Sequence, residues 1–353
     1  MLDRKYAQLG ANKAVELLNI DSPTGFTENI AAKLVQEFTS LGYKCELSNK
    51  GNVLVTVSSP DSSPNSSSSN DVILFEAHGD TLGAMVKQIK SNGRLLVSPL
   101  GGLVAANAET ENVRVYTRDN KIYEGTFQLE NASSHVNKDL RSKERSFDTV
   151  EIVLDERVNS KEDVKKLGIS VGDFVCVEPR AHITNTGYIK SRFLDDKLSV
   201  GTLLAFATYL KENNIKLNKK VYFLITVYEE VGHGGACIPN DVTEAISVDM
   251  GCVGDGLECT ETQVSICAKD SGGPYDKSVV DKLVKAAIKE DADYAIDVYP
   301  YYGSDVEATL SAGYDVKHGL IGPGVYASHG YERSHIDGVY NTLKVLKAYL
   351  EDC

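Results

Sequence analysis

The chain has 353 residues, of which 37 are Lys or Arg and 50 are Asp or Glu, so its formal net charge is −13. This excludes a surface that binds nucleic acid through clustered basic residues, because the basic side chains are scattered along the sequence. Hydrophobic residues make up 42% of a chain longer than the ~250–300 residues at which a single core stops growing. We therefore expect a globular protein of two domains.

Neither a membrane span nor a disulfide scaffold is expected. No apolar run approaches the ~18 residues that a membrane span requires, and the first residues lack the apolar block of a signal peptide. The seven cysteines are an odd number, are widely spread and form no C-x-x-C pair. We expect a cytoplasmic protein with reduced thiols and no membrane partner.

The first part of the sequence predicts helices and strands that alternate. The expected elements are helices over 5–19 and 27–41 and strands over 53–57 and 72–77. A serine-rich tract over 58–71 separates the two strands. Such a tract cannot bury apolar area, so we expect a surface loop there.

The pattern changes between residues 84 and 187. Short alternating runs are punctuated there by Gly and Asn, which is typical of a small β-rich domain. After residue 190 helices again alternate with apolar strands, and the expected elements are helices near 197–212, 277–290 and 337–351 and strands over 221–227, 245–248 and 264–268. This alternation indicates an α/β fold.

The predicted fold is therefore α/β, with a mixed, largely parallel sheet flanked by helices and an inserted small β-rich, barrel-like domain. The catalytic α/β domain would comprise residues 1–83 and 189–353, and the inserted domain residues 84–188.

Histidines and carboxylates gather where the predicted strands end, which is where open α/β sheets bind ligands. His78 and Asp80 follow the apolar strand VILFEA. In an extended segment they project to the same face, so His78 could hold a metal while Asp80 orients the imidazole. Alone, this H-x-D pair also fits an ordinary strand end.

Two further acidic pairs stand at predicted element boundaries. Asp195 and Asp196 precede a helix, where they could cap it or bridge two cations. Glu229 and Glu230 end a long apolar strand before a glycine-rich turn. One of these glutamates can ligate a metal while the other takes a proton from water, although a solvated acidic turn is the alternative.

Asp249 ends another apolar strand, where a carboxylate without a partner is costly. His329 follows a turn, with Glu332 three residues later, and His335 is an alternative functional histidine. The combined nitrogen and carboxylate ligands suit zinc, cobalt or manganese, and two metals could share Asp195 as a bridge.

The order of these motifs resembles the dinuclear aminopeptidases, and more closely the glutamyl and deblocking aminopeptidases, also called tetrahedral aminopeptidases. The resemblance covers nearly the whole chain and includes SPTG (22–25), KGNVLV (50–55), LVSPLGG (96–102), LGISVGDFV (167–175) and the late H-x-x-E. It implies a zinc-peptidase-like fold and hydrolysis of the N-terminal residue from peptides with a free N-terminus. It also implies two divalent metal ions per subunit, most simply zinc or cobalt.

The resemblance assigns roles to individual residues. It implies one metal held by His78, Asp195 and Asp249, and a second held by Asp195, Glu230 and His329. Glu229 would be the general base that deprotonates a metal-bridging water, with Asp80 in support. A segment containing Asp305 resembles a family segment near the active site. Family members assemble through the inserted domain, which implies a homo-oligomer, from dimer to dodecamer.

Other functions remain open from the sequence. An amidase or carboxypeptidase with one or two metals on the same fold would cleave substrates with blocked N-termini. A metal-independent glycoside hydrolase, endoglucanase-like, would use two carboxylates and resist chelators. A non-catalytic scaffold would lack a ligand or the base. A preference for acidic N-terminal residues would need a basic pocket residue, for which Arg180, Lys269 and Lys317 are candidates.

Overall fold

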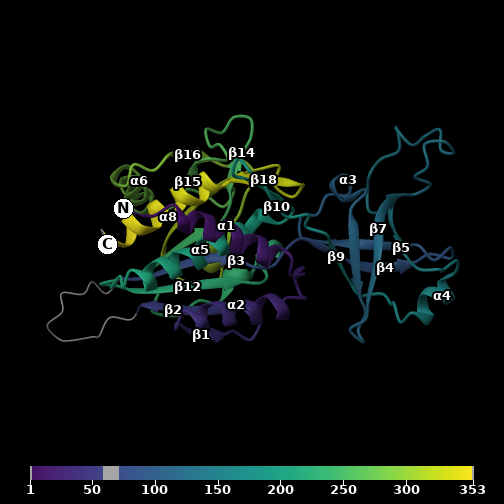
Figure 1. Cartoon of the computed structure of the whole chain (residues 1–353), viewed down its shortest axis with the longest axis horizontal. Helices are drawn as coiled ribbons and strands as arrows, with labels where there is room; N and C mark the ends of the chain where they lie inside the picture. Colours follow the sequence, from purple (N-terminus) through teal and green to yellow (C-terminus); the bar gives the residue numbers. More distant parts are fainter. Residues whose placement is uncertain (1, 59–70, 352–353) are drawn as a thin grey trace.

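A large α/β body carries a β-barrel that projects from one end, on the right in Figure 1. The computed structural model describes residues 2–58 and 71–351. The predicted serine-rich loop falls almost entirely outside these residues. No helix of the described part is long and apolar enough to cross a membrane, and location in the cytoplasm stays a prediction.

The body is built on one 12-stranded sheet, whose main path runs in the order β1-β2-β12-β3-β13-β17-β18-β11-β10. Its strands are β1 (Lys44–Leu47), β2 (Val53–Ser58), β3 (Val72–His78), β10 (His182–Ile183), β11 (Tyr188–Ser191), β12 (Lys220–Thr226), β13 (Glu244–Val248), β14 (Gly251–Val253), β15 (Val264–Lys269), β16 (Tyr294–Val298), β17 (Lys317–Tyr326) and β18 (Glu332–His335). The centre, β12-β3-β13-β17, is parallel, whereas both ends of this path pair antiparallel. The sheet is thus mixed with a parallel centre, which confirms the predicted fold class.

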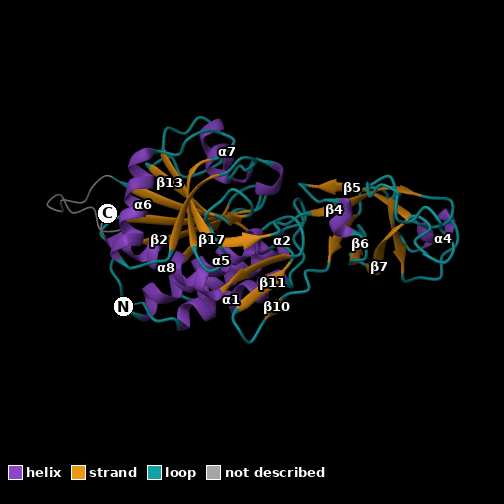
Figure 2. Ribbon diagram, turned by 90° about the horizontal axis from the view of Figure 1, so that it is seen from above, coloured by secondary structure: helices purple, strands orange, loops and turns teal. Residues whose placement is uncertain are grey.

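Helices cover one face of this sheet (Figure 2). A second cluster of apolar side chains covers the other face. The covering helices are α1 (Lys5–Leu18), α2 (Glu28–Ser40), α5 (Leu194–Glu212), α6 (Lys277–Lys289) and α8 (Ile336–Glu351). Strand β3 is buried on both faces: Ile73 and Phe75 contribute to the helix-side core, and Leu74 to the other. The short helix α7 (Asp305–Ser311) packs on that other side.

The close packing of α1 on α5 depends on a glycine. A Cβ added at Gly201 would lie 2.5 Å from the backbone oxygen of Gly10, so only glycine lets the two helices approach this closely. Helix α5 in turn packs on β3. This packing fixes the N-terminal end of α5 beside the end of β3.

The inserted segment forms a closed barrel with the strand order β4-β5-β8-β7-β6-β9. Its strands are β4 (Gly83–Ile89), β5 (Leu95–Leu100), β6 (Asn112–Tyr116), β7 (Ile122–Leu129), β8 (Val150–Leu154) and β9 (Phe174–Val177), and the short helices α3 (Ala105–Ala108) and α4 (Lys161–Lys166) lie between them. Alternate residues such as Val113 and Val115 are buried, as barrel closure requires. The expected barrel-like insertion is confirmed, while the domain boundaries at 83/84 and 188/189 stay a prediction.

A polar and aromatic contact holds the barrel against the body. Asp21, just after α1, accepts two hydrogen bonds of 2.6 Å from the guanidinium of Arg114 and one of 2.7 Å from the hydroxyl of Tyr116. Phe26 stacks on Phe174 of β9 with 5.4 Å between ring centroids. These contacts fix how the barrel loops face the carboxyl ends of the central strands.

Candidate metal centre

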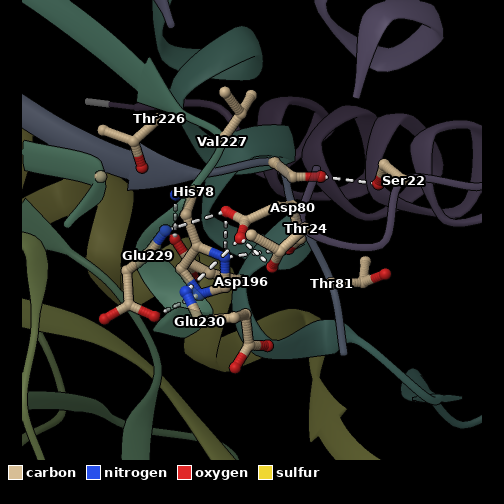
Figure 3. A network of polar contacts seen from close by, with 12 residues as sticks. Ser22, Thr24, His78, Asp80, Thr81, Asp196, Thr226, Val227, Glu229 and Glu230 are labelled. Carbon is tan, nitrogen blue, oxygen red and sulfur yellow. Dashed lines mark hydrogen bonds and ion pairs between the residues drawn. The ribbon is translucent and has the colours of Figure 1, made fainter. Parts of the chain in front are cut away.

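The central parallel strands bring the predicted site residues together. Strand β3 ends at His78, β13 ends one residue before Asp249, and β12 is followed by the 3-10 turn η1 (Glu229–Val231). Because these strands are parallel neighbours, their carboxyl ends meet at one edge of the sheet. Asp195 and Asp196 stand at the start of α5, beside this edge. Figure 3 shows His78, Asp80 and the Glu229-Glu230 turn facing one another.

His78 is buried and lies among carboxylates. Its Nε2 is 3.0 Å from Oδ1 of Asp195 and 3.7 Å from Oε2 of Glu229, and its Nδ1 is 3.0 Å from the backbone oxygen of Asp80. Burial lowers the pKa of His78, but the hydrogen bond to Asp195 and the charges of Glu229 and Asp249 raise it well above its usual value overall.

His329 approaches the same aspartate from the other side. Its Nε2 lies 3.7 Å from Oδ2 of Asp195 and 3.8 Å from Oε2 of Glu230. Its Nδ1 lies 3.2 Å from the backbone oxygen of Gly102, which follows strand β5 of the barrel. Asp195 therefore presents one carboxylate oxygen to each of two histidines.

Two groups of side chains in the described part could each hold a cation, with ligand atoms within 4.8 Å of one another. One group is His78, Asp195 and Glu230, and the other is His78, Asp196 and Asp249. Asp196 belongs to the second group, although the resemblance assigned a metal only to its neighbour Asp195. Its Oδ2 also accepts a hydrogen bond of 3.1 Å from the backbone N–H of His78.

Asp80 has a wider role than the expected contact with His78. Its Oδ1 lies 3.6 Å from Nδ1 of His78. Its carboxylate also accepts hydrogen bonds from the hydroxyl of Thr24 at 2.6 Å and from the backbone N–H groups of Glu229 and Glu230 at 3.2 and 3.4 Å. Asp80 thus fixes the turn that presents both glutamates.

Glu332 joins two parts of the site, a role the sequence left open. Its Oε1 accepts from the backbone N–H of His329 at 2.9 Å, and its Oε2 accepts from the backbone N–H of Asp195 at 3.1 Å. The H-x-x-E spacing places this carboxylate on the turn of His329, but its bond to Asp195 has no signal in the sequence.

Asp305 and His335, the two remaining candidates from the sequence, lie outside the cluster. Asp305 accepts from the hydroxyl of Thr226 and, at 2.6 Å, from the backbone N–H of Gly235, so it supports the turn after Glu230. Nε2 of His335 contacts the backbone oxygen of Thr186 at 2.8 Å.

The electrostatics of the cluster fit bound cations. Burial, together with neighbouring carboxylates, raises the pKa of Glu229 and Glu230 well above the usual range, and raises that of Asp249 to about 7. Oε1 of Glu230 and Oδ1 of Asp196 are buried and have no hydrogen-bond partner among the described residues. The cluster thus offers closely spaced carboxylates, some with oxygens that lack a hydrogen bond, together with two imidazoles. Zinc, cobalt and manganese bind this set of ligands.

A cavity of about 520 Å³ opens beside the cluster. Asp195, Glu229, Glu230, Asp249 and His329 all line it, so a molecule in the cavity can reach the atoms that would hold the metals. Tyr301, Tyr302 and Glu307 form part of the remaining wall.

Such a cluster at the carboxyl ends of parallel strands, beside an open cavity, is typical of an enzyme with an α/β fold that uses metal ions. The chain belongs to the M42 glutamyl aminopeptidase family, whose model matches residues 61–345. The resemblance seen in the sequence is thereby confirmed. The chain is a peptidase of the aminopeptidase type, and its family depends on divalent metal ions.

A relative supports this assignment, and two solved structures share the fold. The chain is 42% identical over 337 residues to YhfE of Bacillus subtilis (strain 168), and the match covers 95% of each chain. The name given to YhfE describes it as a presumed aminopeptidase. The aminopeptidase APDkam598 of Desulfurococcus kamchatkensis has a TM-score of 0.84 at 22% identity, covering 99% of this chain and 96% of the other. The TET1 peptidase of Pyrococcus horikoshii has a TM-score of 0.82 at 22% identity, and the match covers 97% of this chain and 99% of the other. That peptidase is described as assembling into a tetrahedron or a large octahedral shell.

Proposed function

We propose that the protein is a dinuclear metal-dependent aminopeptidase that removes the N-terminal residue from peptides with a free N-terminus. The observation that carries this proposal is the placement of Asp195, which offers one oxygen to His78 at 3.0 Å and the other to His329 at 3.7 Å. A carboxylate shared in this way would suit two divalent cations.

Each metal would take one histidine and one further carboxylate beside the shared aspartate. The proposed ligands are His78, Asp195 and Asp249 for one metal, and Asp195, Glu230 and His329 for the other. Asp196 also lies within ligand distance of His78 and Asp249, and it fixes the backbone of His78. Zinc and cobalt fit this mixture of nitrogen and oxygen ligands.

The chemistry that two bound divalent cations supply at such a cluster is polarisation of a carbonyl and a lowered pKa for water. Glu229 acts as the general base: it takes a proton from the attacking water and delivers it to the leaving amine. Burial raises the pKa of Glu229, which suits a group that must both accept and release a proton near neutral pH. Asp80 holds this base in place through the backbone N–H of Glu229.

We also propose that the chain forms a homo-oligomer, between a dimer and a dodecamer. The support is the presence of the barrel, together with solved structures of the same fold described as a dodecamer or as a tetrahedral or octahedral shell. Size-exclusion chromatography with light scattering measures the mass of the assembly.

The test of the activity is hydrolysis of aminoacyl-p-nitroanilides with free and with blocked N-termini. Each substrate is assayed before chelation, after chelation, and after zinc or cobalt is returned. Cleavage restricted to free N-termini, lost on chelation and restored by metal, supports the proposal. Equal cleavage of blocked substrates would indicate an amidase or carboxypeptidase, and activity that survives thorough chelation would refute a metal mechanism.

A further inference from the structure

One acidic residue of the cavity has no place in the metal cluster. The acids that line the cavity are Asp195, Glu229, Glu230, Asp249 and Glu307. The first four are the proposed ligands and base, whose four negative charges two divalent cations would offset. Glu307, on α7, is the remaining acidic side chain, and no Lys or Arg is among the residues that line the cavity.

The Glu307 carboxylate sits in a space made by glycines. A Cβ added at Gly272 would lie 1.8 Å from Oε1 of Glu307, and one at Gly303 would lie 3.2 Å from Oε2. The backbone at Gly272 therefore lies so close to this carboxylate that any side chain at that position would collide with it. Gly303 also lines the cavity, so the carboxylate stands at the cavity wall.

Glu307 faces a second, buried carboxylate. Asp270 is 1% exposed and is held by the hydroxyl of Tyr275 at 2.5 Å and the backbone N–H of Gly272 at 2.9 Å. Burial and the neighbouring Asp270 raise the pKa of Glu307 to about 8. At neutral pH the two carboxyl groups therefore hold a proton between them, and a cation placed between them and the cavity would take the place of that proton.

The cationic groups nearby do not neutralise this pair. Nζ of Lys269 contacts the backbone oxygen of Asp270 at 2.7 Å rather than a carboxylate. Burial lowers the pKa of His318, which favours its neutral form. In the described part of the chain, no ion pair within 4.0 Å involves Glu307 or Asp270.

We propose that Glu307 binds the cationic side chain of the substrate's N-terminal residue, so that the enzyme prefers peptides that begin with Lys or Arg. This inference rests on the proposed aminopeptidase function. A flexible Lys or Arg side chain in the cavity would bring a charge-assisted hydrogen bond to Glu307 and supply the cation that the Glu307–Asp270 pair lacks.

The same arrangement disfavours acidic N-terminal residues, because the basic candidates are occupied elsewhere or lie off the cavity wall. Arg180 pairs with Glu111 at 2.5 Å, and Nζ of Lys317 contacts the hydroxyl of Ser278 at 3.4 Å. Neither residue lines the cavity, and Lys269 does not line it either.

The test compares lysyl-, arginyl-, norleucyl- and glutamyl-p-nitroanilides on the wild type, Glu307→Gln and a control variant. Norleucine has nearly the length of lysine without its ammonium group, so the lysine-to-norleucine ratio of kcat/KM isolates the charge. The matched control is Glu156→Gln, which removes an exposed carboxylate that does not line the cavity.

We expect the wild type to favour lysine over norleucine by at least about tenfold, the scale of one hydrogen bond to a charged group. Glu307→Gln should abolish that preference through KM, with norleucine changed less than twofold, and Glu156→Gln should keep it. A ratio near one in the wild type, while norleucine is cleaved, would overturn the inference alone. An equal loss on all substrates in Glu307→Gln would overturn it in favour of α-amine binding. Failure to cleave any free N-terminus would instead refute the proposed function.

Discussion

Replacing Gly102 with alanine tests whether the barrel takes part in the metal centre. A Cβ at this position would lie 2.5 Å from Nδ1 and 2.6 Å from Cε1 of His329. Ordinary contacts between such atoms begin near ~3.5 Å, so the imidazole must retreat by about 1 Å. Ligand distances in metal sites tolerate only about 0.2 Å, and a retreat of this size would remove His329 from the centre.

The alanine would also disturb the hydrogen bond that orients the ring of His329. In its present position the ring can donate Nδ1–H to the backbone oxygen of Gly102, which leaves the lone pair of Nε2 facing Asp195 and Glu230. Loss of such a supporting bond typically costs ~10–100-fold in metal affinity or activity. We expect Gly102→Ala to lose kcat/KM by this factor and to need more metal for half-maximal activity.

The assay is kcat/KM on the best unblocked p-nitroanilide during a titration of zinc or cobalt, with circular dichroism as a check of folding. Gly254→Ala is the matched control, because a Cβ there meets nothing within 4 Å. A folded Gly102→Ala protein with wild-type activity and metal requirement would refute both the positioning of His329 by the barrel and its role as a ligand.

Four further predictions follow from the site. Glu229→Gln should lower kcat by about 10²–10⁴-fold with metal content unchanged, and a loss below tenfold would exclude Glu229 as the base. Asp80→Asn should lower kcat/KM by ~10–100-fold, because the carboxylate that accepts hydrogen bonds from the turn carrying Glu229 is lost. An unchanged melting temperature would show that the variant is folded. Chelation should lower the melting temperature and returned metal should restore it, since a ligand at 100 times its Kd adds about 2.7 kcal/mol to the free energy of unfolding. An unchanged melting curve would contradict metal binding at the cluster. The lysine-to-norleucine ratio of kcat/KM should rise with pH, because Glu307, with a pKa of about 8, ionises only toward higher pH; a ratio that rises equally in Glu307→Gln would assign the effect to another group.

The five long helices and most central strands could be predicted because their apolar residues recur with a clear period, whereas the short helices α3, α4 and α7 could not. Strand β17 could not, although it pairs with β13, β14, β15 and β18. Its sequence KHGLIGPGVY contains three glycines and a proline, which normally argue against a strand interior. The structure gives the reason for one of them: a Cβ at Gly322 would lie 1.4 Å from the backbone oxygen of Asp249.

The candidate metal ligands could be predicted because parallel strands end at one edge of the sheet. That rule needs only the order of apolar runs and acidic ends, and it brings His78, Glu230 and Asp249 together. The supporting contacts of the site follow no such rule. Asp80 and Glu332 act on backbone N–H groups, and a backbone group carries no sequence signal of its partner. The contact of His329 with Gly102 depends on how the barrel docks.

The supporting carboxylates explain how so many negative charges can be held together in one site. Each oxygen of Glu332 accepts a backbone N–H from a different segment, one at Asp195 and one at His329. Asp80 does the same for the turn at Glu229. Because the bonds from Glu332 to Asp195 and from Asp80 to Glu229 join residues far apart in the sequence, no local segment can present these side chains alone. The cluster therefore forms only when the sheet, the start of α5 and the barrel loop are all in place, which would tie the proposed metal binding to the complete fold.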